Sequence, residues 1–248
     1  MRSWRALLAR LLSLASLARV TRVKRIGLIG GLSWESTRTY YSLLNEVTQL
    51  RAGPWQQPPV AIDSLNFADV VELQRLGDWA STGRLLADSA RRLEAGGADV
   101  LAICANTMHI NFPEVQSAVS VPVLDIRDAV AAGVRALGAS SITLLGTKYL
   151  IEADFFSSRL EDVGIRVIKP DPVQTDELQD MIFDQLTQGV VSESALERFL
   201  AIADDCRRRG GEVVGLCCTE FGLLVDEASA PWPCVDSTVA HVNALLDF

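Results

Sequence analysis

A repeated segment is the feature that most restricts the fold of this chain. "EAGGADVLAIC" (94–104) and "RRGGEVVGLCC" (208–218) each contain a helix end, two glycines, an acidic residue, an apolar run and a cysteine. "RIGLIGG" (25–31) and "SITLLGT" (141–147) form a second pair, and each is an apolar run ending in a glycine turn. Ile26 and Ile142 stand 116 residues apart, and Cys104 and Cys218 stand 114 apart. The repeat predicts two related halves, 24–135 and 136–248, with the C-terminal segment able to pack back on the first half.

Short apolar runs alternate with longer amphipathic stretches, which is typical of βαβ units and a parallel sheet. Strands are expected within 25–31, 59–67, 98–104, 121–126, 141–147, 165–170, 212–218 and 234–237. Helices are expected within 82–96, 128–137, 150–163, 176–188 and 193–209. The predicted fold class is α/β, with two pseudo-symmetric, doubly wound parallel-sheet domains. Ligands of such sheets bind at the carboxyl ends of the strands, so we expect the active site in a cleft between the domains.

Composition excludes several classes of protein. The chain has 248 residues, of which 49% are apolar and 22% charged, as in ordinary globular proteins. Its net charge of −8 argues against a nucleic-acid partner. A membrane span would need about 20 apolar residues, and arginines interrupt the apolar run of the leader, so no membrane span is predicted. Residues 1–23 form a basic leader, either an organelle transit peptide or an over-long start. Five cysteines without a CxxC pair indicate a reducing compartment, the cytoplasm unless the leader directs the protein to an organelle.

Two polar turns follow the cysteine-bearing strands. In "CCTEFG" a thiol, Cys218, is followed at once by a hydroxyl and a carboxylate, Thr219 and Glu220. A helix beginning there would lower the pKa of the thiol and favour the reactive thiolate. "CANTMH" has the same build, and Asn106 and Thr107 either bind a substrate carboxylate or cap the next helix. Cys104 is either a core thiol or a second catalytic group, because free cysteine is among the most buried residue types.

Other site chemistries fit poorly. "GLIGG" lacks the spacing of a dinucleotide-binding loop, and its backbone amides suit a small carboxylate better. Cys217, Cys218, Cys234, His109 and His241 have no zinc-like spacing, so we expect neither a metal nor another cofactor. His241 is either an ordinary core or surface histidine or a group that promotes ionisation of a thiol.

Six motifs in order identify a family resemblance. They are "IGLIGGLSWESTRTYYSLLNE" (26–46), "ELQRLGDW" (72–79), "NTMH" (106–109), "LLGTKY" (144–149), "CTEFGLLV" (218–225) and "DSTVAH" (236–241). From about residue 24 onward the chain resembles the aspartate/glutamate racemase family, in particular its broad-specificity amino-acid racemase branch. The resemblance implies a cofactor-independent homodimer that acts on a small amino acid. It also implies two groups that serve opposite faces of the α-carbon, as inversion requires.

One position departs from the family pattern. The family motif C-N-T places a catalytic cysteine directly before Asn-Thr, whereas this chain has Ala105 there and Cys104 one residue earlier. A shift of one residue on a strand moves a side chain to the opposite face. Counting from the Gly-Gly pairs equates Cys104 with Cys218, but aligning Asn-Thr with Thr-Glu equates Ala105 with Cys218. We prefer the second count, because the turn that binds the ligand is the more constrained.

The resemblance also places Leu32, Gln74 and Ala105 at substrate-contacting positions. The arginine segment of aspartate-specific members is missing from "SLNFADVVE" (64–72), so recognition of a side-chain carboxylate is not predicted.

These observations predict a racemase or epimerase of aspartate, glutamate or related amino acids. Cys218 is the principal acid/base and Cys104 the candidate second group. Thr219, Asn106 and Thr107 hold the substrate carboxylate. Glu220 and His241 tune the thiol or receive the ammonium group. Two alternatives stay open because of Ala105: a lyase with one thiol, similar to arylmalonate decarboxylases, and a non-catalytic protein that binds a small ligand.

Overall fold

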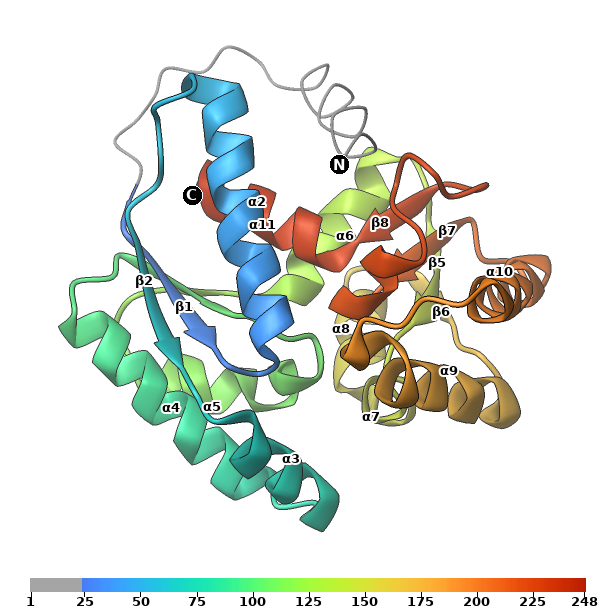
Figure 1. The fold of residues 1–248 in the computed structure, drawn as a ribbon, viewed down its shortest axis with the longest axis horizontal. Helices are drawn as coiled ribbons and strands as arrows, with labels where there is room; N and C mark the ends of the chain where they lie inside the picture. The colour runs from blue at the N-terminus through green and yellow to red at the C-terminus, as the bar shows by residue number, and fades with distance from the viewer. Residues whose placement is uncertain (1–23) are drawn as a thin grey trace. The chain divides into compact units, whose positions relative to one another are not determined.

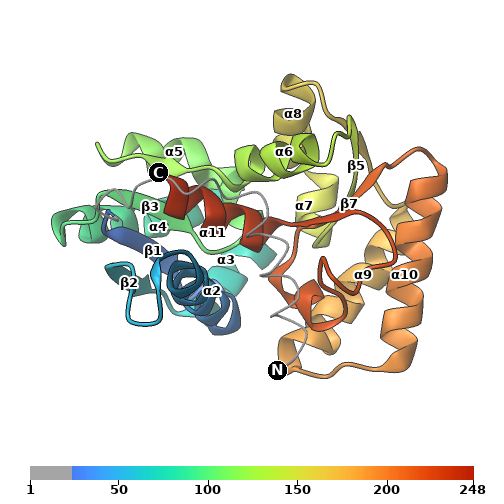
Figure 2. The ribbon, with the colours of Figure 1, turned by 90° about the horizontal axis from the view of Figure 1, so that it is seen from above.

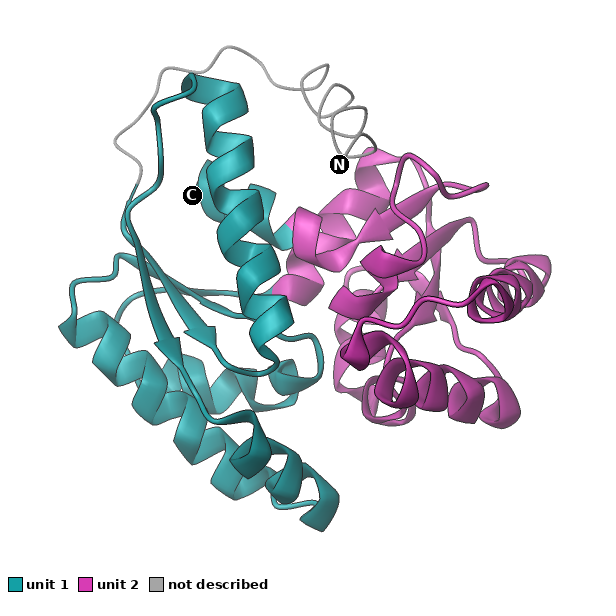
Figure 3. Cartoon of the chain, in the orientation of Figure 1, with its two compact units in different colours: residues 1–125, 241–248 teal, residues 126–240 magenta. Residues whose placement is uncertain are grey.

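The protein is described by a computed structural model that covers residues 24–248. The leader expected over residues 1–23 lies outside the described residues. The chain divides into two compact units, which Figure 3 shows in different colours. Unit 1 contains the described residues through Asp125 together with His241–Phe248, and unit 2 contains Ile126–Ala240.

Unit 1 is built on four parallel strands in the order β2-β1-β3-β4. They are β1 (Ile26–Gly30), β2 (Val60–Ser64), β3 (Val100–Ile103) and β4 (Val123–Leu124). β1 and β3 are buried along their whole length. A parallel sheet has helices on both faces, which explains why these strands are continuous apolar runs in the sequence.

Helices cover both faces of this sheet. They are α2 (Trp34–Ala52), α3 (Phe67–Leu76), α4 (Trp79–Ala95), the 3₁₀ helix η1 (Thr107–Asn111) and α5 (Phe112–Ser117). In Figure 1, α2 lies on one face of the sheet and α4 with α5 on the other, and α4 packs on β1 and β2.

The turn between β1 and α2 depends on a glycine. Gly31 has a φ of 70°, and a Cβ added to it would lie 2.1 Å from the carbonyl oxygen of Leu65. Any other residue would meet both a steric clash and an unfavourable backbone conformation there. Ser33 then caps α2, because its hydroxyl accepts a hydrogen bond from the amide of Ser36 at 3.3 Å.

Unit 2 repeats this arrangement with the strand order β6-β5-β7-β8. Its strands are β5 (Ser141–Leu145), β6 (Arg166–Ile168), β7 (Val213–Leu216) and β8 (Cys234–Asp236), and all pairs are parallel. In each unit the first strand in sequence lies between the second and the third.

The helices of unit 2 again form two layers. They are α6 (Ile126–Ala136), α7 (Lys148–Glu152), α8 (Asp154–Asp162), α9 (Pro172–Asp184), η2 (Leu186–Gln188), α10 (Glu193–Arg208), η3 (Thr219–Leu223) and α11 (Ser237–Asp247), whose last part belongs to unit 1. Figure 2 shows α6 and α8 on one side of β5 and β7, with α9 and α10 on the other.

The predicted α/β fold with two repeated parallel sheets is confirmed, and each expected apolar run contains a strand. The division between the units differs from the expected boundary at residue 135. It falls between Asp125 and Ile126, because α6 packs on β8 and α8 and therefore belongs to unit 2. The expected helix over 150–163 is interrupted at Ala153, where the backbone is extended between α7 and α8.

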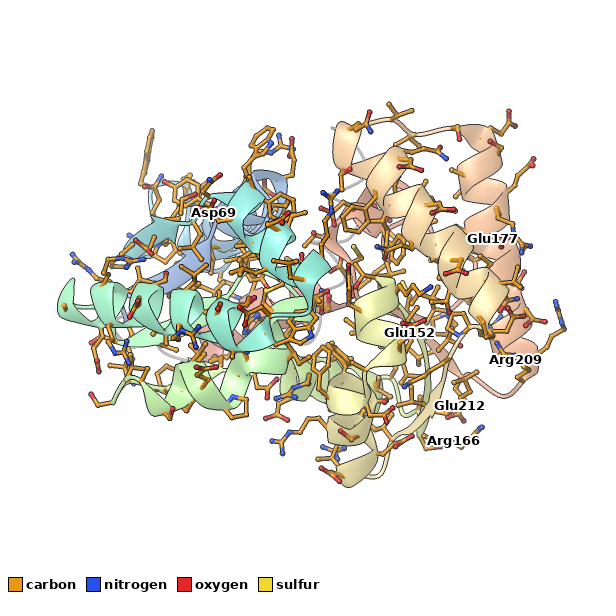
Figure 4. The ribbon with its side chains drawn as sticks, turned by 90° about the horizontal axis from the view of Figure 1, so that it is seen from below. Asp69, Glu152, Arg166, Glu177, Arg209 and Glu212 are labelled. Atoms are coloured by element: carbon orange, nitrogen blue, oxygen red, sulfur yellow. The ribbon has the colours of Figure 1, made fainter. Side chains whose placement is uncertain are left out.

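The acidic residue of the repeated segment has the same role in both units. Asp99 accepts a hydrogen bond from the amide of Arg25, just before β1, at 2.7 Å. Glu212 accepts one from the amide of Ser140, just before β5, at 2.8 Å. Figure 4 labels Glu212 and Arg166 at this amino-terminal end of the unit 2 strands, where Arg166 donates to the carbonyl oxygen of Gly210 at 2.8 Å. The repeated acids are therefore structural and lie at the opposite end of the strands from the cysteines.

Candidate functional site

Cys218 lies at the carboxyl end of β7, where the chain leaves the sheet of unit 2. The amide of Cys217 still donates to the carbonyl oxygen of Leu145 on β5, at 2.8 Å, so strand pairing reaches residue 217. Cys218 is the next residue; it has extended backbone and precedes η3. Its side chain is buried but not completely, with 8% of the residue exposed. Cys218 is therefore placed where parallel sheets present their ligand-binding groups.

A carboxylate is bonded directly to this thiol. The Sγ–H of Cys218 donates to Oε2 of Glu220 at 3.0 Å, and the hydroxyl of Thr219 donates to the same oxygen at 2.8 Å. Burial, followed by the charge of Glu220 and this hydrogen bond, raises the pKa of the Cys218 thiol well above its ordinary value. The expectation that a following helix lowers this pKa is wrong in this structure, because η3 is a short 3₁₀ turn and a carboxylate faces the sulfur.

Cys104 belongs to the core of unit 1. It is fully buried, and its amide donates to the carbonyl oxygen of Ile29 on β1 at 3.0 Å. Its own carbonyl oxygen accepts a hydrogen bond from the Ser36 hydroxyl at 2.6 Å. Burial raises the pKa of the Cys104 thiol, so the thiolate is strongly disfavoured. These contacts place Cys104 in the core of unit 1, and its predicted role as a second catalytic group stays a prediction.

Strand register relates the two cysteine-bearing turns. Ile29 is paired with Ile103 in unit 1, and Leu145 with Leu216 in unit 2. The next amide in each unit, that of Cys104 or Cys217, donates to the matching carbonyl oxygen of the central strand. Cys104 is therefore the structural equivalent of Cys217, which is also buried in the core.

The same register relates the residues that follow Cys104 and Cys217. By the same register, Ala105 is equivalent to Cys218, as the count from the Asn-Thr turn predicted. The count from the Gly-Gly pairs was misleading, because unit 1 has one more residue than unit 2 between these glycines and the paired strand. Residues 104–106 separate β3 from η1, whereas only residues 217–218 separate β7 from η3. Neither the strands nor the 3₁₀ helices equate Cys104 with Cys218.

The polar turn of unit 1 is held by a histidine. Nδ1–H of His109 donates to the carbonyl oxygen of Ala105 at 2.8 Å. Asn106 and Thr107 are buried, with 5% and 8% exposed, and they lie at the start of η1. Asn106 makes no side-chain cap to η1. The turn therefore places an amide and a hydroxyl at the carboxyl end of β3.

His241 is occupied within unit 1. Its Nε2–H donates to the carbonyl oxygen of Leu124 at 3.0 Å, so Nδ1 accepts, and the hydroxyl of Tyr40 donates to it at 2.8 Å. Burial, together with the neighbouring His109, lowers the pKa of His241 to about 3, so the ring is neutral. Both ring nitrogens are therefore engaged by groups of unit 1. The predicted role of His241 in promoting thiol ionisation stays a prediction.

Replacing Tyr40 with phenylalanine tests this account of His241. The change leaves the buried Nδ1 acceptor of His241 without its donor, and we expect the free energy of unfolding at pH 7 to fall by about 1–3 kcal/mol. Urea denaturation followed by circular dichroism measures it. Tyr41→Phe is the matched control, because Tyr41 is on the same helix and 47% exposed. Equal stabilities of the two variants would contradict the proposed hydrogen bond.

Leu32 and Gln74 both lie in unit 1. Leu32 follows the glycine turn after β1, is 6% exposed and joins the core. Gln74 is on α3, with 9% of the residue exposed. Their predicted contacts with substrate stay predictions.

Two half-buried carboxyl groups near the end of β8 were not predicted. Asp236 ends β8 and accepts hydrogen bonds from the amides of Thr238 and Val239 at the start of α11, at 2.8 and 3.3 Å. Glu227 accepts one from the amide of Asp236 at 3.0 Å. Burial raises the pKa of Asp236 to about 6 and that of Glu227 to about 7. The polar start of "DSTVAH" was a sequence signal for Asp236, but nothing local distinguishes Glu227.

Glu227 makes folding depend on pH in a defined direction. Its pKa is raised from 4.5 to about 7 in the folded protein, so the folded state binds more protons in this range and stability falls as the pH rises through it. We expect Glu227→Gln to be about 1–3 kcal/mol more stable than the parent at pH 8 and similar to it near pH 4. Denaturation at both pH values measures this, with the exposed Glu197→Gln as control. A Glu227→Gln variant that is less stable at pH 8 would show that the charged form is favoured.

Within residues 24–248, no group of three or more His, Cys, Asp or Glu side chains is arranged to hold a metal ion. No helix in that range combines the length and apolarity that crossing a membrane requires.

Known proteins match this chain over nearly all of the described region. The model of the Asp/Glu/hydantoin racemase family matches residues 29–245. The broad-specificity amino-acid racemase RacX of Bacillus subtilis is 24% identical over 158 residues. That alignment covers 62% of this chain and 66% of RacX, so the matched part is slightly less than two thirds of the relative.

Solved structures extend the similarity to the fold. A candidate Asp/Glu racemase of Yersinia pestis is 35% identical, with a TM-score of 0.84, over 90% of this chain and 98% of that one. An aspartate racemase homologue of Pyrococcus horikoshii is 33% identical, with a TM-score of 0.80 and the same coverage. The matched residues of the family model include the Cys218 turn, and the chain is therefore a member of the Asp/Glu/hydantoin racemase family.

Proposed function

We propose that this protein is an amino-acid racemase or epimerase that works without a cofactor and uses Cys218 as its principal acid/base. The observation that carries the proposal is the Cys218 thiol at the carboxyl end of β7, hydrogen-bonded to the buried carboxylate of Glu220. Membership of the racemase family supports the reaction class. The substrates proposed are aspartate, glutamate or related amino acids.

The chemistry assigned to Cys218 is proton transfer at the α-carbon. The thiolate takes the α-proton, so the C–H bond breaks, an S–H bond forms and the electron pair stays on the substrate as an enolate. Returning a proton to the opposite face completes inversion. Ala105 occupies the position equivalent to Cys218 in unit 1 and has no proton to give, so water or another hydroxyl has to supply it. Losing a positioned acid costs about 10²- to 10⁴-fold in rate, and we therefore propose a slow racemase.

The remaining polar groups are assigned to substrate binding. Asn106 and Thr107 offer an amide and a hydroxyl to the substrate carboxylate. Thr219 is assigned to the same carboxylate, and its hydroxyl must turn away from Glu220 to donate to it. Glu220 receives the α-ammonium group. A buried carboxylate next to the reacting thiol favours a cationic neighbour, which supports an amino acid over a malonate as the substrate.

The setting of the enzyme is also part of the proposal. All five cysteines, which lie in the described region, are free thiols, as expected in a reducing compartment such as the cytoplasm. The family resemblance supports a homodimer.

A lyase with one thiol is the second candidate, and Ala105 is the observation that favours it. Decarboxylation leaves a carbanion that needs one proton on one face, which Cys218 could deliver alone. Release of carbon dioxide from an arylmalonate, lost in Cys218→Ala, would favour the lyase.

The test of the first proposal is turnover by the full chain after dialysis against a chelator. The protein is incubated separately with the L- and D-forms of aspartate and glutamate, and the enantiomers are separated by chiral chromatography. We expect slow formation of the opposite enantiomer of at least one of them. Activity that appears only after a metal ion or pyridoxal phosphate is added would contradict the proposal.

A further inference from the structure

Glu220 is the acceptor in the hydrogen bonds of the Cys218 turn. Oε2 of Glu220 accepts two hydrogen bonds, from the thiol of Cys218 at 3.0 Å and from the hydroxyl of Thr219 at 2.8 Å. In this arrangement the thiol is a donor and therefore keeps its proton, while the carboxylate oxygen accepts from both groups.

Forming the thiolate in this arrangement is unfavourable. Ionisation would remove the donated hydrogen bond and place two negative groups within hydrogen-bond distance, in a site where both residues are buried. Cys217 is also buried, and a charge on it would oppose the Cys218 thiolate rather than stabilise it. Glu220 thus opposes the form of Cys218 that the proposed reaction needs.

We propose that Glu220 keeps Cys218 protonated in the ligand-free protein, and that the ammonium group of a bound amino acid releases the thiolate by pairing with Glu220. The S–H bond then breaks, its electron pair stays on sulfur, and the proton passes through water to the buffer. An ammonium group cancels the charge that opposes the thiolate and adds a favourable one. Only ligands with an amino group would activate the thiol. This inference rests on the proposed function for the identity of the ligand, but not for the state of the free protein.

Thiolate absorbance in the ultraviolet tests the inference without turnover. Spectra of the full chain and of each variant are recorded from pH 6 to about 11.5, and spectra of the same protein carrying Cys218→Ala are subtracted so that only Cys218 contributes. We expect Glu220→Gln to move the titration midpoint down by at least about one pH unit, because the amide has no charge. Glu197→Gln, at an exposed carboxylate of the same unit, should leave the midpoint in place. A midpoint that stays or rises in Glu220→Gln would overturn the inference and show that Glu220 accepts the thiol proton instead.

Glycine and glycolate test the ligand part on the parent protein. The two differ in having an ammonium or a hydroxyl group on the same carbon, and glycine has no chiral centre to invert. We expect glycine, but not glycolate, to lower the Cys218 midpoint of the parent, and glycine to have no effect on Glu220→Gln. An equal response to both ligands, or none to glycine, would contradict release by an ammonium group. These titrations distinguish the inference from the proposed function. The predicted shifts can occur in a protein that fails the racemase assay, and a protein that passes the assay can lack the shifts.

Discussion

Cys218→Ala is expected to slow exchange of the substrate α-proton by about 10²- to 10⁴-fold, the usual contribution of a positioned acid or base. This loss corresponds to roughly 3–5 kcal/mol of transition-state stabilisation. The reason is geometric, because Cys218 lies just after β7, beside Glu220 and Thr219, while its counterpart Ala105 has no ionisable group. Incorporation of deuterium from D₂O, followed by proton NMR, measures the rate for the full chain and the variant.

Cys104→Ala is the matched control, since Cys104 is also the buried cysteine of a repeated segment. It lies in the core of unit 1, and we expect its exchange rate to stay within about threefold of the parent, below the smallest acid/base effect. Melting temperatures of both variants show whether the fold is intact. A large loss of α-proton exchange in Cys104→Ala, with Cys218→Ala unaffected, would show that Cys104 moves the α-proton and Cys218 does not.

Ala105→Cys is expected to raise the rate of inversion by up to about 10²- to 10⁴-fold, because it adds a thiol at the position equivalent to Cys218. Exchange should increase less than inversion, since the new group serves the face that lacks a proton donor. Chiral chromatography and deuterium incorporation, measured on the same samples, separate the two rates.

The double variant Cys104→Ala, Ala105→Cys is the control, because it keeps the new thiol at position 105 and removes the thiol at position 104. If the new cysteine acts from position 105, the double variant should invert substrate as fast as Ala105→Cys. Unchanged inversion in a folded Ala105→Cys variant would contradict the equivalence of Ala105 and Cys218.

The repeat in the sequence was sufficient to predict the sheets. Apolar runs ending at Gly30 and Cys104, matched by those ending at Gly146 and Cys218, required strands of similar length in two similar halves. The division between the halves was less accessible. α6 is amphipathic wherever the boundary falls, and only its packing on β8 and α8 assigns it to unit 2.

The site was predicted less completely because single-residue shifts decide it. Sequence patterns located the turns at Asn106 and Cys218, but two counts of the repeat gave different partners for Cys218. Only the hydrogen bonds of Cys104 and Cys217 to the central strands select between them.

The electrostatics of the site depend on contacts that no sequence pattern encodes. The helix expected after Cys218 suggested a lowered thiol pKa, whereas the hydrogen bond to Glu220 contributes to raising it. Nothing in the sequence around His241 indicates that the hydroxyl of Tyr40 and the carbonyl oxygen of Leu124, both distant in sequence, bond to its two ring nitrogens.

The central claim is that Cys218 moves the α-proton in a site that lacks the second thiol. The ratio of α-deuterium incorporation to inversion, measured at early times in D₂O with the parent protein, tests it most directly. A single thiol returns deuterium mainly to the face from which it took the proton, so we predict that incorporation exceeds inversion several-fold and that both are lost in Cys218→Ala. One inversion for each deuterium incorporated would contradict the claim, because it would require a second proton-transfer group of equal strength on the opposite face.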